Sequence, residues 1–217
     1  MGEHVRLEGL LFDLDGVLVQ SMKAHLRAYE EALSPWCQAP ELSDLAGRRT
    51  EDVVVSCLRP HGCDQATIAQ VVKAKRTLAA AYLDELGEHL LTTGAVDLLV
   101  QARARGLDLG ICTSGSRASI DRFLTLARLS GSDFACLLAS EDVSHAKPHP
   151  EVYIRACQML GRDPGVCAVV EDSRSGMAAA LAAGCPLIAY RDTSSDVQVP
   201  AEALGVVTSL SEVMNFI

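Results

Sequence analysis

The sequence has few aromatic residues and few positive charges. Phe, Trp and Tyr make up 4% of the 217 residues, and 19 Lys and Arg face 28 Asp and Glu, which gives a formal net charge of −9. The chain contains no long run of Lys or Arg. Nucleic acids and anionic membranes attract proteins through positive surfaces, so we expect neither as a partner.

Long hydrophobic runs and paired cysteine motifs are also missing. No apolar run is long enough to span a bilayer, and the first residues, MGEHVRLEG, do not resemble a signal peptide. The eight cysteines are scattered without a C-x-x-C motif, and several lie inside apolar runs. These features predict reduced cysteines and a cytoplasmic protein, either a monomer or a small homo-oligomer.

What the chain does contain is a regular alternation of short apolar segments and helical segments. The apolar segments cover residues 7–13, 107–113, 134–140, 166–172 and 185–190, with a weaker one at 205–209. Their nearly continuous apolar character is typical of strands covered on both faces. Helices are predicted between them at 94–106, 117–129, 149–161 and 173–184. We therefore predict an α/β fold with a doubly wound, Rossmann-like parallel sheet as its core.

Residues 20–90 break this alternation, because only helices are predicted there. They cover residues 21–33, 50–58 and 64–86, with Thr50 as the expected N-cap of the second. In the third, apolar residues recur at helical spacing. An all-helical block directly after the first strand predicts an inserted cap domain. We assign residues 19–89 to the helical cap and residues 1–18 and 90–217 to the α/β catalytic core.

Two carboxylates, Asp13 and Asp15, follow the first apolar segment in LLFDLDGVL. Residues two apart on a strand point to the same face, so both would share one side if the strand continued. Ligands of open α/β sheets bind at the carboxyl ends of the strands, where this pair could hold Mg²⁺ or act as nucleophile and acid/base. A solvated turn would account for the isolated motif equally well, since Asp and Gly favour turns.

A second acidic pair, Glu171 and Asp172, ends the apolar segment at 166–172. Asp172 or Ser173 could be a simple helix N-cap. Four carboxylates at one sheet edge, however, would repel each other by about 4 kcal/mol for each pair at ~4 Å. A hard dication with oxygen ligands relieves this repulsion, and Mg²⁺ prefers carboxylates, waters and phosphate oxygens. The two pairs together therefore predict a Mg²⁺ site.

Two further segments offer phosphate-binding groups. Thr113 and Ser114 end the segment at 107–113 and lead into a helix, where a hydroxyl and free amides can hold a phosphate, or can simply cap the helix. Lys147 precedes Pro148 in a loop and is the only lysine in the second half of the chain. A solvated loop position is the ordinary role of such a lysine, but a phosphate site benefits from a cation there.

These four elements, in this order, resemble the motifs of the haloacid dehalogenase superfamily. The chain has D-x-D-G-x-L from Asp13 to Leu18, a strand-ending Thr113, the Lys147–Pro148 pair, and the acidic pair Glu171–Asp172. The resemblance covers essentially the whole chain. The second aspartate and the cap make it similar to the β-phosphoglucomutase-like and CbbY-like phosphatase branch.

The resemblance implies a mechanism. Asp13 would attack phosphorus and form an aspartyl-phosphate, and Asp15 would act as general acid and then as general base. Mg²⁺ would be held by the Asp13 carboxylate, the Asp15 carbonyl, Asp172 and, less firmly, Glu171. The residues that would bind the transferring phosphoryl group are Thr113, the Ser114 amide and Lys147.

The cap contributes weaker candidates. His25 lies in a helix beside apolar residues, where a core histidine is the ordinary interpretation, but the segment is similar to the cap of β-phosphoglucomutase-like members. Arg48 and Arg49 could reach a distal anionic group of the substrate. Lys73, Lys75 and Arg76 are further candidates for this role, and a solvated helix face accounts for them equally well.

Three positions depart from the pattern of the superfamily. Gln20 stands where relatives commonly have Asp, Thr93 replaces a usual Pro, and an ungapped comparison puts Thr77 where β-phosphoglucomutases have a sugar-binding lysine. The last departure weakens the mutase interpretation. We predict a Mg²⁺-dependent phosphatase acting on a small phosphorylated metabolite such as a sugar or polyol phosphate. The alternatives are a phosphosugar mutase and, in another class, a phospho-accepting signalling or binding protein without turnover.

Overall fold

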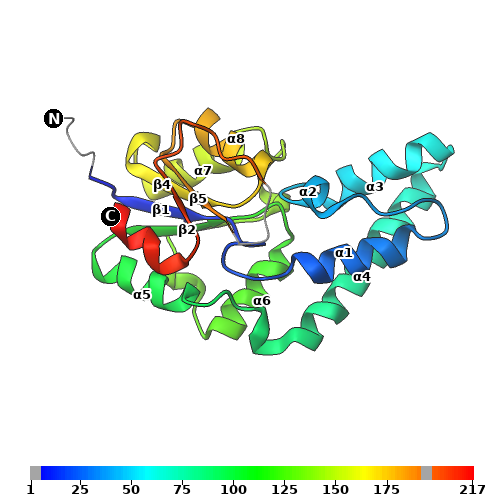
Figure 1. The fold of residues 1–217 in the computed structure, drawn as a ribbon, viewed down its shortest axis with the longest axis horizontal. Coiled ribbons are helices and arrows are strands. Elements are labelled where there is room, and N and C mark those ends of the chain that lie inside the picture. Colours follow the sequence, from blue (N-terminus) through cyan, green and yellow to red (C-terminus); the bar gives the residue numbers. More distant parts are fainter. Residues whose placement is uncertain (1–5, 192–196) are drawn as a thin grey trace.

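Six parallel strands form one sheet at the centre of the protein (Figure 1). The computed structural model describes residues 6–191 and 197–217. The strands lie in the order β3-β2-β1-β4-β5-β6. Their bounds are β1 Gly9–Phe12, β2 Asp108–Cys112, β3 Cys136–Leu138, β4 Cys167–Glu171, β5 Leu187–Tyr190 and β6 Gly205–Val207. All six predicted strands are present, and each is shorter than predicted because apolar residues also fill the adjoining turns.

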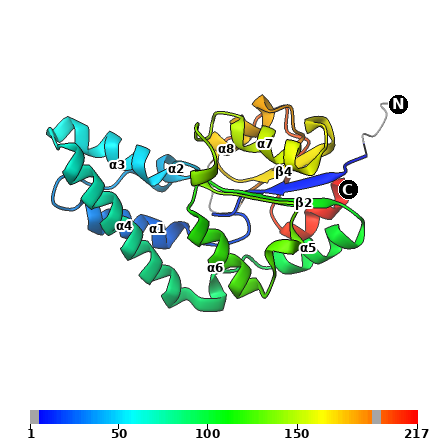
Figure 2. The ribbon, with the colours of Figure 1, turned by 180° about the vertical axis from the view of Figure 1, so that it is seen from behind.

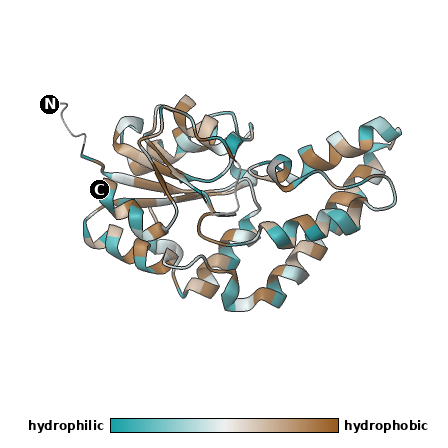
Figure 3. Cartoon of the chain, in the orientation of Figure 1, coloured by the Kyte–Doolittle hydropathy of each residue, from teal (hydrophilic) through white to brown (hydrophobic). Residues whose placement is uncertain are grey.

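Helices cover both faces of this sheet, as the two opposite views show (Figures 1 and 2). They are α5 Ala95–Ala104, α6 Arg117–Ala127, α7 Glu151–Leu160 and α8 Arg174–Ala182. Leu10 and Phe12 of β1 pack in one hydrophobic cluster with residues of α5 and α6. Leu11 packs in another with residues of α7 and α8. The alternation along β1 therefore supplies two cores, hydrophobic residues line the strands (Figure 3), and the predicted doubly wound fold is confirmed.

Local signals fix most helix ends. The Ser173 hydroxyl accepts a hydrogen bond from the Gly176 amide at 3.0 Å, so Ser173 is the N-cap of α8. Gly161 ends α7 in the left-handed conformation, with φ of 65°. Pro150 stands one position before α7 rather than inside its first turn, and Thr50 is the first residue of its helix rather than the N-cap. Arg49, which is extended, takes the N-cap position instead.

Four helices between β1 and α5 pack beside the sheet as a separate layer (Figure 1). They are α1 Met22–Leu33, α2 Leu42–Leu45, α3 Thr50–Leu58 and α4 Gln65–Leu86. Helix α2, a single turn, is too short to leave a periodic signal in the sequence. Tyr29, Leu33, Val53, Leu58 and Val72 belong to a third hydrophobic cluster within this layer. In the part of the chain that is described, no helix has the length and apolar character to cross a membrane.

Two linkers join the helical layer to the sheet, and they pair with each other. Val19 forms an antiparallel bridge with Leu91, and the Gln20 amide donates to the Leu90 carbonyl at 2.8 Å. The Gln20 side chain donates to the Thr92 hydroxyl at 3.0 Å, which gives this unusual residue a role in joining the linkers. Nothing in the structure explains Thr93, which is exposed. The pairing of the two linkers supports a cap at residues 19–89. The exact division of the chain into cap and core remains a prediction.

All eight cysteines are free thiols, as predicted. Five are buried and behave as small hydrophobic residues, three of them in strands β2, β3 and β4. The buried cysteines are Cys112, Cys136, Cys157, Cys167 and Cys185. The fold therefore uses its cysteines for packing.

Helix α5 allows a direct test of the packing. Leu98 is 1% exposed, whereas Val100 on the same helix is 56% exposed. We expect Leu98→Ala to lower the free energy of unfolding by about 3 kcal/mol, because it leaves a cavity between helix and sheet. Val100→Ala is the matched control and should change it by less than about 0.5 kcal/mol. Urea denaturation measures both, and equal effects would contradict the assigned packing.

Candidate active site

The two aspartates of the first motif lie at the carboxyl end of β1 and line one cavity. The Asp13 amide still donates to the Val170 carbonyl of β4 at 3.0 Å, but the strand ends at Phe12. The strand therefore does not continue to Asp15, so strand alignment is not what brings the two carboxylates together. A turn through Gly16, which has a φ of 93°, brings Asp15 to the cavity instead.

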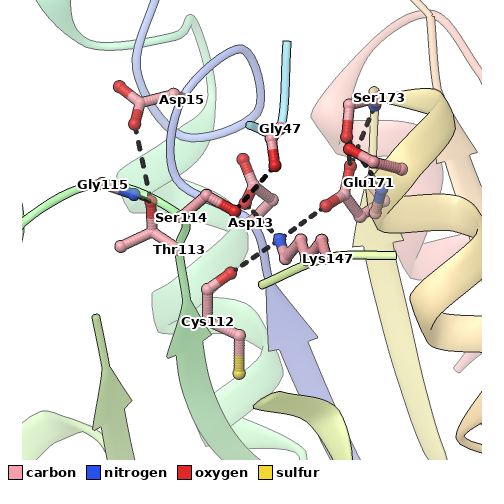
Figure 4. Close-up of polar contacts among 12 residues, drawn as sticks. Asp13, Asp15, Gly47, Cys112, Thr113, Ser114, Gly115, Lys147, Glu171 and Ser173 are labelled. Carbon is pink, nitrogen blue, oxygen red and sulfur yellow. Dashed lines mark hydrogen bonds and ion pairs between the residues drawn. The ribbon is translucent and has the colours of Figure 1, made fainter. Parts of the chain in front are cut away.

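Lys147 is the centre of the buried charges (Figure 4). Its ammonium donates to Asp13 Oδ1 at 2.5 Å, to Glu171 Oε1 at 2.6 Å and to the Cys112 carbonyl at 3.0 Å. The side chains of all three charged residues are at most 5% exposed. A buried ammonium that lost both carboxylates would be strongly destabilising, so the three charges depend on one another. Lys147 is therefore no solvated loop residue.

Glu171 is held by three further hydrogen bonds. The Tyr153 hydroxyl donates to its Oε1 at 3.1 Å, and the Ser173 amide and hydroxyl donate to its Oε2 at 2.9 and 3.0 Å. With Lys147, these donors occupy both oxygens of the carboxylate. Tyr153 is one of the residues that could not be found from the sequence, because a tyrosine in an amphipathic helix gives no sign that its hydroxyl has a charged partner.

Asp172 completes the acidic cluster and has an unsatisfied atom. Among the described residues, its Oδ1 is the one buried side-chain oxygen or nitrogen without a hydrogen-bond partner. Oxygens of Asp13, Glu171 and Asp172 all lie within 4.8 Å of one another. A Cβ on Gly16 would lie 2.0 Å from Asp172 Oδ2, so only glycine fits opposite this carboxylate. An unpartnered oxygen among close carboxylates is the environment that a hard dication satisfies.

The pKa values in this cluster reflect the same crowding. Burial raises the pKa of Asp13 to about 8; Lys147 opposes the rise, while the charges of Glu171 and Asp15 add to it. Burial and the charge of Glu171 also raise the pKa of Asp172 well above its ordinary value. Added positive charge would lower both values, which is a second reason why the cluster suits a cation.

Thr113 and Ser114 lie where β2 leads towards α6, on the wall of the same cavity. Thr113 Oγ1 accepts a hydrogen bond from the Gly115 amide at 2.9 Å and lies 3.5 Å from Asp15 Oδ2. The Ser114 hydroxyl donates to the Gly47 carbonyl at 2.8 Å. These two residues thus share the cavity with the aspartates, as the sequence suggested, and Ser114 also contacts the helical layer.

Asp15 is bound by residues of α1. The Ser21 hydroxyl donates a short hydrogen bond to Asp15 Oδ1, and His25 Nε2 lies 3.4 Å from the same oxygen. Burial raises the pKa of Asp15, but hydrogen bonds from His25 and Ser21 and the charges of His25 and Lys75 outweigh it and lower the pKa to about 2. His25 is therefore a cavity residue rather than a core histidine.

Lys75 of α4 also lines the cavity, so of its two interpretations the solvated helix face is wrong. It is 4% exposed, and its Nζ lies 3.1 Å from His25 Nδ1, 3.4 Å from the Thr50 hydroxyl and 4.3 Å from the centre of the Tyr29 ring. Burial lowers its pKa to about 8. The sequence feature that indicates its burial is the apolar stripe of α4, because position 75 follows Val71 and Val72 at helical spacing. Lys73 and Arg76 are exposed, as expected.

The two cap arginines differ in their surroundings. Arg48 lines the cavity and donates to the carbonyls of Asp44 and Asp52 at 3.5 and 3.4 Å. The Arg49 guanidinium turns to a loop of the core, where it donates to the carbonyls of Ser140 and Val143 at 3.0 and 2.7 Å. Arg49 was expected to reach the substrate, but its guanidinium instead joins the helical layer to the core.

Comparison with known proteins decides the family. The family model described as haloacid dehalogenase-like hydrolase matches residues 7–184. The chain belongs to the haloacid dehalogenase-like hydrolases. Curated relatives agree: the chain is 32% identical over 194 residues to protein CbbY of Rhodobacter capsulatus, with 85% of each chain covered. It is 34% identical over 196 residues to hexitol phosphatase A of Escherichia coli, with 85% of this chain and 83% of the relative covered.

Solved structures show the same haloacid dehalogenase-like fold. A β-phosphoglucomutase from Clostridium difficile superposes with a TM-score of 0.83 at 18% identity, covering 97% of this chain and 96% of the other. A variant of CbbY from Rhodobacter sphaeroides in complex with xylulose-(1,5)bisphosphate superposes with a TM-score of 0.80 at 25% identity, covering 95% and 96%. The family and fold inferred from the four motifs are thus confirmed.

The buried charge of Lys75 should lower the free energy of unfolding of this haloacid dehalogenase-like protein. The ammonium is buried without a carboxylate within hydrogen-bonding distance among the described residues, so Lys75→Met should raise the free energy of unfolding by about 3 kcal/mol at pH 7. Because the folded-state pKa is about 8 and the ordinary value is 10.5, the gain is full below pH 8 and shrinks as the pH rises. Urea denaturation at pH 7 and pH 9.5 measures it. Lys73→Met, on the exposed face of the helix, is the control. If Lys75→Met raises the free energy of unfolding no more than Lys73→Met does, the claim that the buried ammonium destabilises the protein is wrong.

Proposed function

We propose that this protein is a Mg²⁺-dependent phosphatase that hydrolyses a small sugar or polyol phosphate through a phosphorylated Asp13. The observation that carries the proposal is the buried ion group in which Lys147 holds Asp13 beside the unpartnered oxygen of Asp172. A carboxylate fixed at a sheet edge, next to a cation and a second aspartate, is arranged for nucleophilic attack on a phosphate ester.

The lining of the cavity supports a small phosphorylated substrate. Thr113, Ser114 and Gly115 face it from the core and offer hydroxyl and amide donors for phosphoryl oxygens. Arg48 and Lys75 face it from the helical layer and supply positive charge for the rest of the substrate. Two relatives are named for such substrates: hexitol phosphatase A, and a validoxylamine A 7'-phosphate phosphatase of Streptomyces hygroscopicus that is 32% identical over 211 residues.

Mg²⁺ would be held by Asp13, Asp172 and the Asp15 carbonyl, with Glu171 turned to Lys147 and Ser173 instead. When bound, the ion supplies positive charge that neutralises the carboxylates and the phosphoryl oxygens. The orphaned Asp172 oxygen and the raised pKa of Asp13 both fit this donor set. In the bound state the lowered pKa of Asp13 would keep the nucleophile ionised.

The reaction then needs two displacements at phosphorus. In the first, a carboxylate oxygen of Asp13 bonds to phosphorus, the ester bond breaks, and the leaving oxygen takes a proton from Asp15. In the second, water gives a proton to Asp15 and bonds to phosphorus, and the Asp13–phosphorus bond breaks to release inorganic phosphate. Lys147 keeps Asp13 in position and stabilises the negative charge near it throughout.

The surroundings of Asp15 bear on how these steps alternate. A pKa of about 2 keeps Asp15 ionised at neutral pH, and only the ionised form can accept a proton from water. The acid role requires a protonated Asp15, which follows when the bonds from His25 and Ser21 are released and the pKa rises. Because both partners belong to the helical layer or its linker, movement of that layer would switch Asp15 between the two roles.

A phosphosugar mutase is the second candidate, and Lys75 is the observation that favours it. The mutase interpretation was weakened because Thr77 stands where β-phosphoglucomutases have a sugar-binding lysine. Lys75, which reaches the cavity from α4, could take the place of that lysine. A hexose 1-phosphate with a catalytic amount of hexose bisphosphate distinguishes the two: isomerised sugar phosphate without free phosphate supports the mutase, and free phosphate supports the phosphatase.

The role of Asp13 is tested by Asp13→Asn. Release of phosphate from a panel of sugar and polyol phosphates should fall by at least about 1,000-fold, because an amide is a poor nucleophile. Asp121→Asn, an exposed residue of α6, is the matched control and should keep full activity. Hydrolysis that survives in Asp13→Asn would refute the proposed nucleophile. Phosphorylation of the wild-type protein without turnover would instead support a signalling role.

The metal site is tested by binding as well as by activity. Removing divalent ions with EDTA should abolish phosphate release, and added Mg²⁺ should restore it. Asp172→Ala should weaken Mg²⁺ binding in isothermal titration calorimetry by at least about tenfold, because a charged ligand is lost. Asp142→Ala, outside the cavity, should leave the affinity unchanged. Full activity in EDTA would contradict the metal requirement.

A further inference from the structure

The loop before α7 carries a second group of metal-ligating side chains, His145, His149 and Glu151. The two imidazole rings stack with their centres 4.4 Å apart and their planes 29° from parallel. One ligand atom from each of the three residues lies within 4.8 Å of the others. Both histidines are exposed, whereas Glu151 is partly covered. None of the three lines the cavity that holds Asp13 and Asp15.

Glu151 is fixed in place by backbone amides. Its Oε1 accepts from the Ser144 amide and its Oε2 from the His145 amide, both at 2.8 Å. These bonds, together with the His145 ring, lower the pKa of Glu151 to about 2, so its negative charge is permanent at neutral pH. The loop therefore keeps an ionised carboxylate beside the two rings.

The ring of His145 points one nitrogen directly at the carboxylate. Its Nδ1 lies 2.8 Å from Glu151 Oε2. An ion that replaces the proton between these two atoms would have both of them as ligands. The His149 ring is also oriented, because its Nδ1 accepts from the Glu151 amide at 3.3 Å.

A surface hollow beside these residues extends to the helical layer. It is lined by His145 and His149 from the loop and by Asp52 and Arg49 from the start of α3. The Arg49 guanidinium bonds to three carbonyls of the core loop, those of Ser140, Val143 and Ser144. The charges of Asp52 and Arg49 offset each other, and the two exposed rings stay accessible from this hollow.

We propose that His145, His149 and Glu151 form a second metal site that binds a transition-metal dication of the Zn²⁺ class. Two imidazoles and a carboxylate suit such ions, whereas Mg²⁺ prefers oxygen ligands alone, so the site is distinct from the acidic cluster in the cavity. Tetrahedral Zn²⁺ sets its ligand atoms about 3.4 Å apart, as follows from bonds of about 2.1 Å. His145 Nδ1 and Glu151 Oε2 are 2.8 Å apart, so an ion between them requires a separation about 0.6 Å greater.

The position of this site links it to the catalytic loop. His145 and His149 stand two residues on either side of Lys147, whose ammonium bonds to Asp13. An ion bound by both histidines would cross-link the loop around Lys147. It would therefore stabilise the segment that holds the nucleophile.

The test is Zn²⁺ binding to the full-length protein by isothermal titration calorimetry, with excess Mg²⁺ present to occupy the acidic cluster. We expect one Zn²⁺ per chain in the wild type and an affinity at least about tenfold weaker in both His145→Gln and His149→Gln. His61→Gln removes an exposed histidine of the helical layer and should bind as the wild type does. Asp172→Ala should also retain the Zn²⁺ site.

A second probe shows the geometry. Co²⁺ added to the wild type should give the visible absorption of a tetrahedral nitrogen and oxygen site, and this absorption should be lost in His149→Gln. Undiminished Zn²⁺ binding in both histidine variants, loss of binding in Asp172→Ala, or no saturable binding to the wild type would each overturn the proposal. Because the readout is metal binding, these outcomes leave the proposed phosphatase activity to its own test.

Discussion

The buried ion group formed by Lys147, Asp13 and Glu171 is the constraint on which the rest of this structure depends. Three charges lie together in a nearly solvent-free site at the carboxyl end of a parallel sheet. Removing one partner would leave an uncompensated buried charge, which costs several kcal/mol. Strand β1 presents Asp13, strand β4 presents Glu171, and the loop before α7 presents Lys147, so three separate parts of the chain must meet correctly.

The surrounding residues maintain this group. Ser173 caps α8 and donates to Glu171 with the same hydroxyl, so helix formation and carboxylate orientation are coupled. Tyr153 adds a buried hydroxyl from α7. The helical layer acts on the other aspartate, because Ser21 and His25 bind Asp15 and Lys75 lies behind His25. Core residues thus hold Asp13, the proposed nucleophile, while residues of the helical layer bind Asp15, the proposed acid/base.

Much of this could be predicted from the sequence, for physical reasons. Buried parallel strands are apolar throughout, so the six strands and their alternation with helices were visible, and acids at two strand ends marked the site. Side-chain direction could not be predicted in the same way. Arg49 follows Arg48 directly, yet it turns to core carbonyls while Arg48 faces the cavity, because backbone direction at the start of α3 separates them. The sequence left Lys75 open between a substrate-facing and a solvated residue, because its charge favours solvent whereas its place in the apolar stripe favours burial.

The central claim is that the nucleophile held by Lys147 carries the phosphoryl group during turnover. Rapid acid quenching of the wild-type protein with its best substrate, followed by peptide mass spectrometry, tests it most directly. The account predicts the mass of one phosphoryl group on the peptide that contains Asp13, appearing before free phosphate accumulates. Rapid product formation with no phosphorylated peptide, or with the phosphoryl group on another residue, would contradict it.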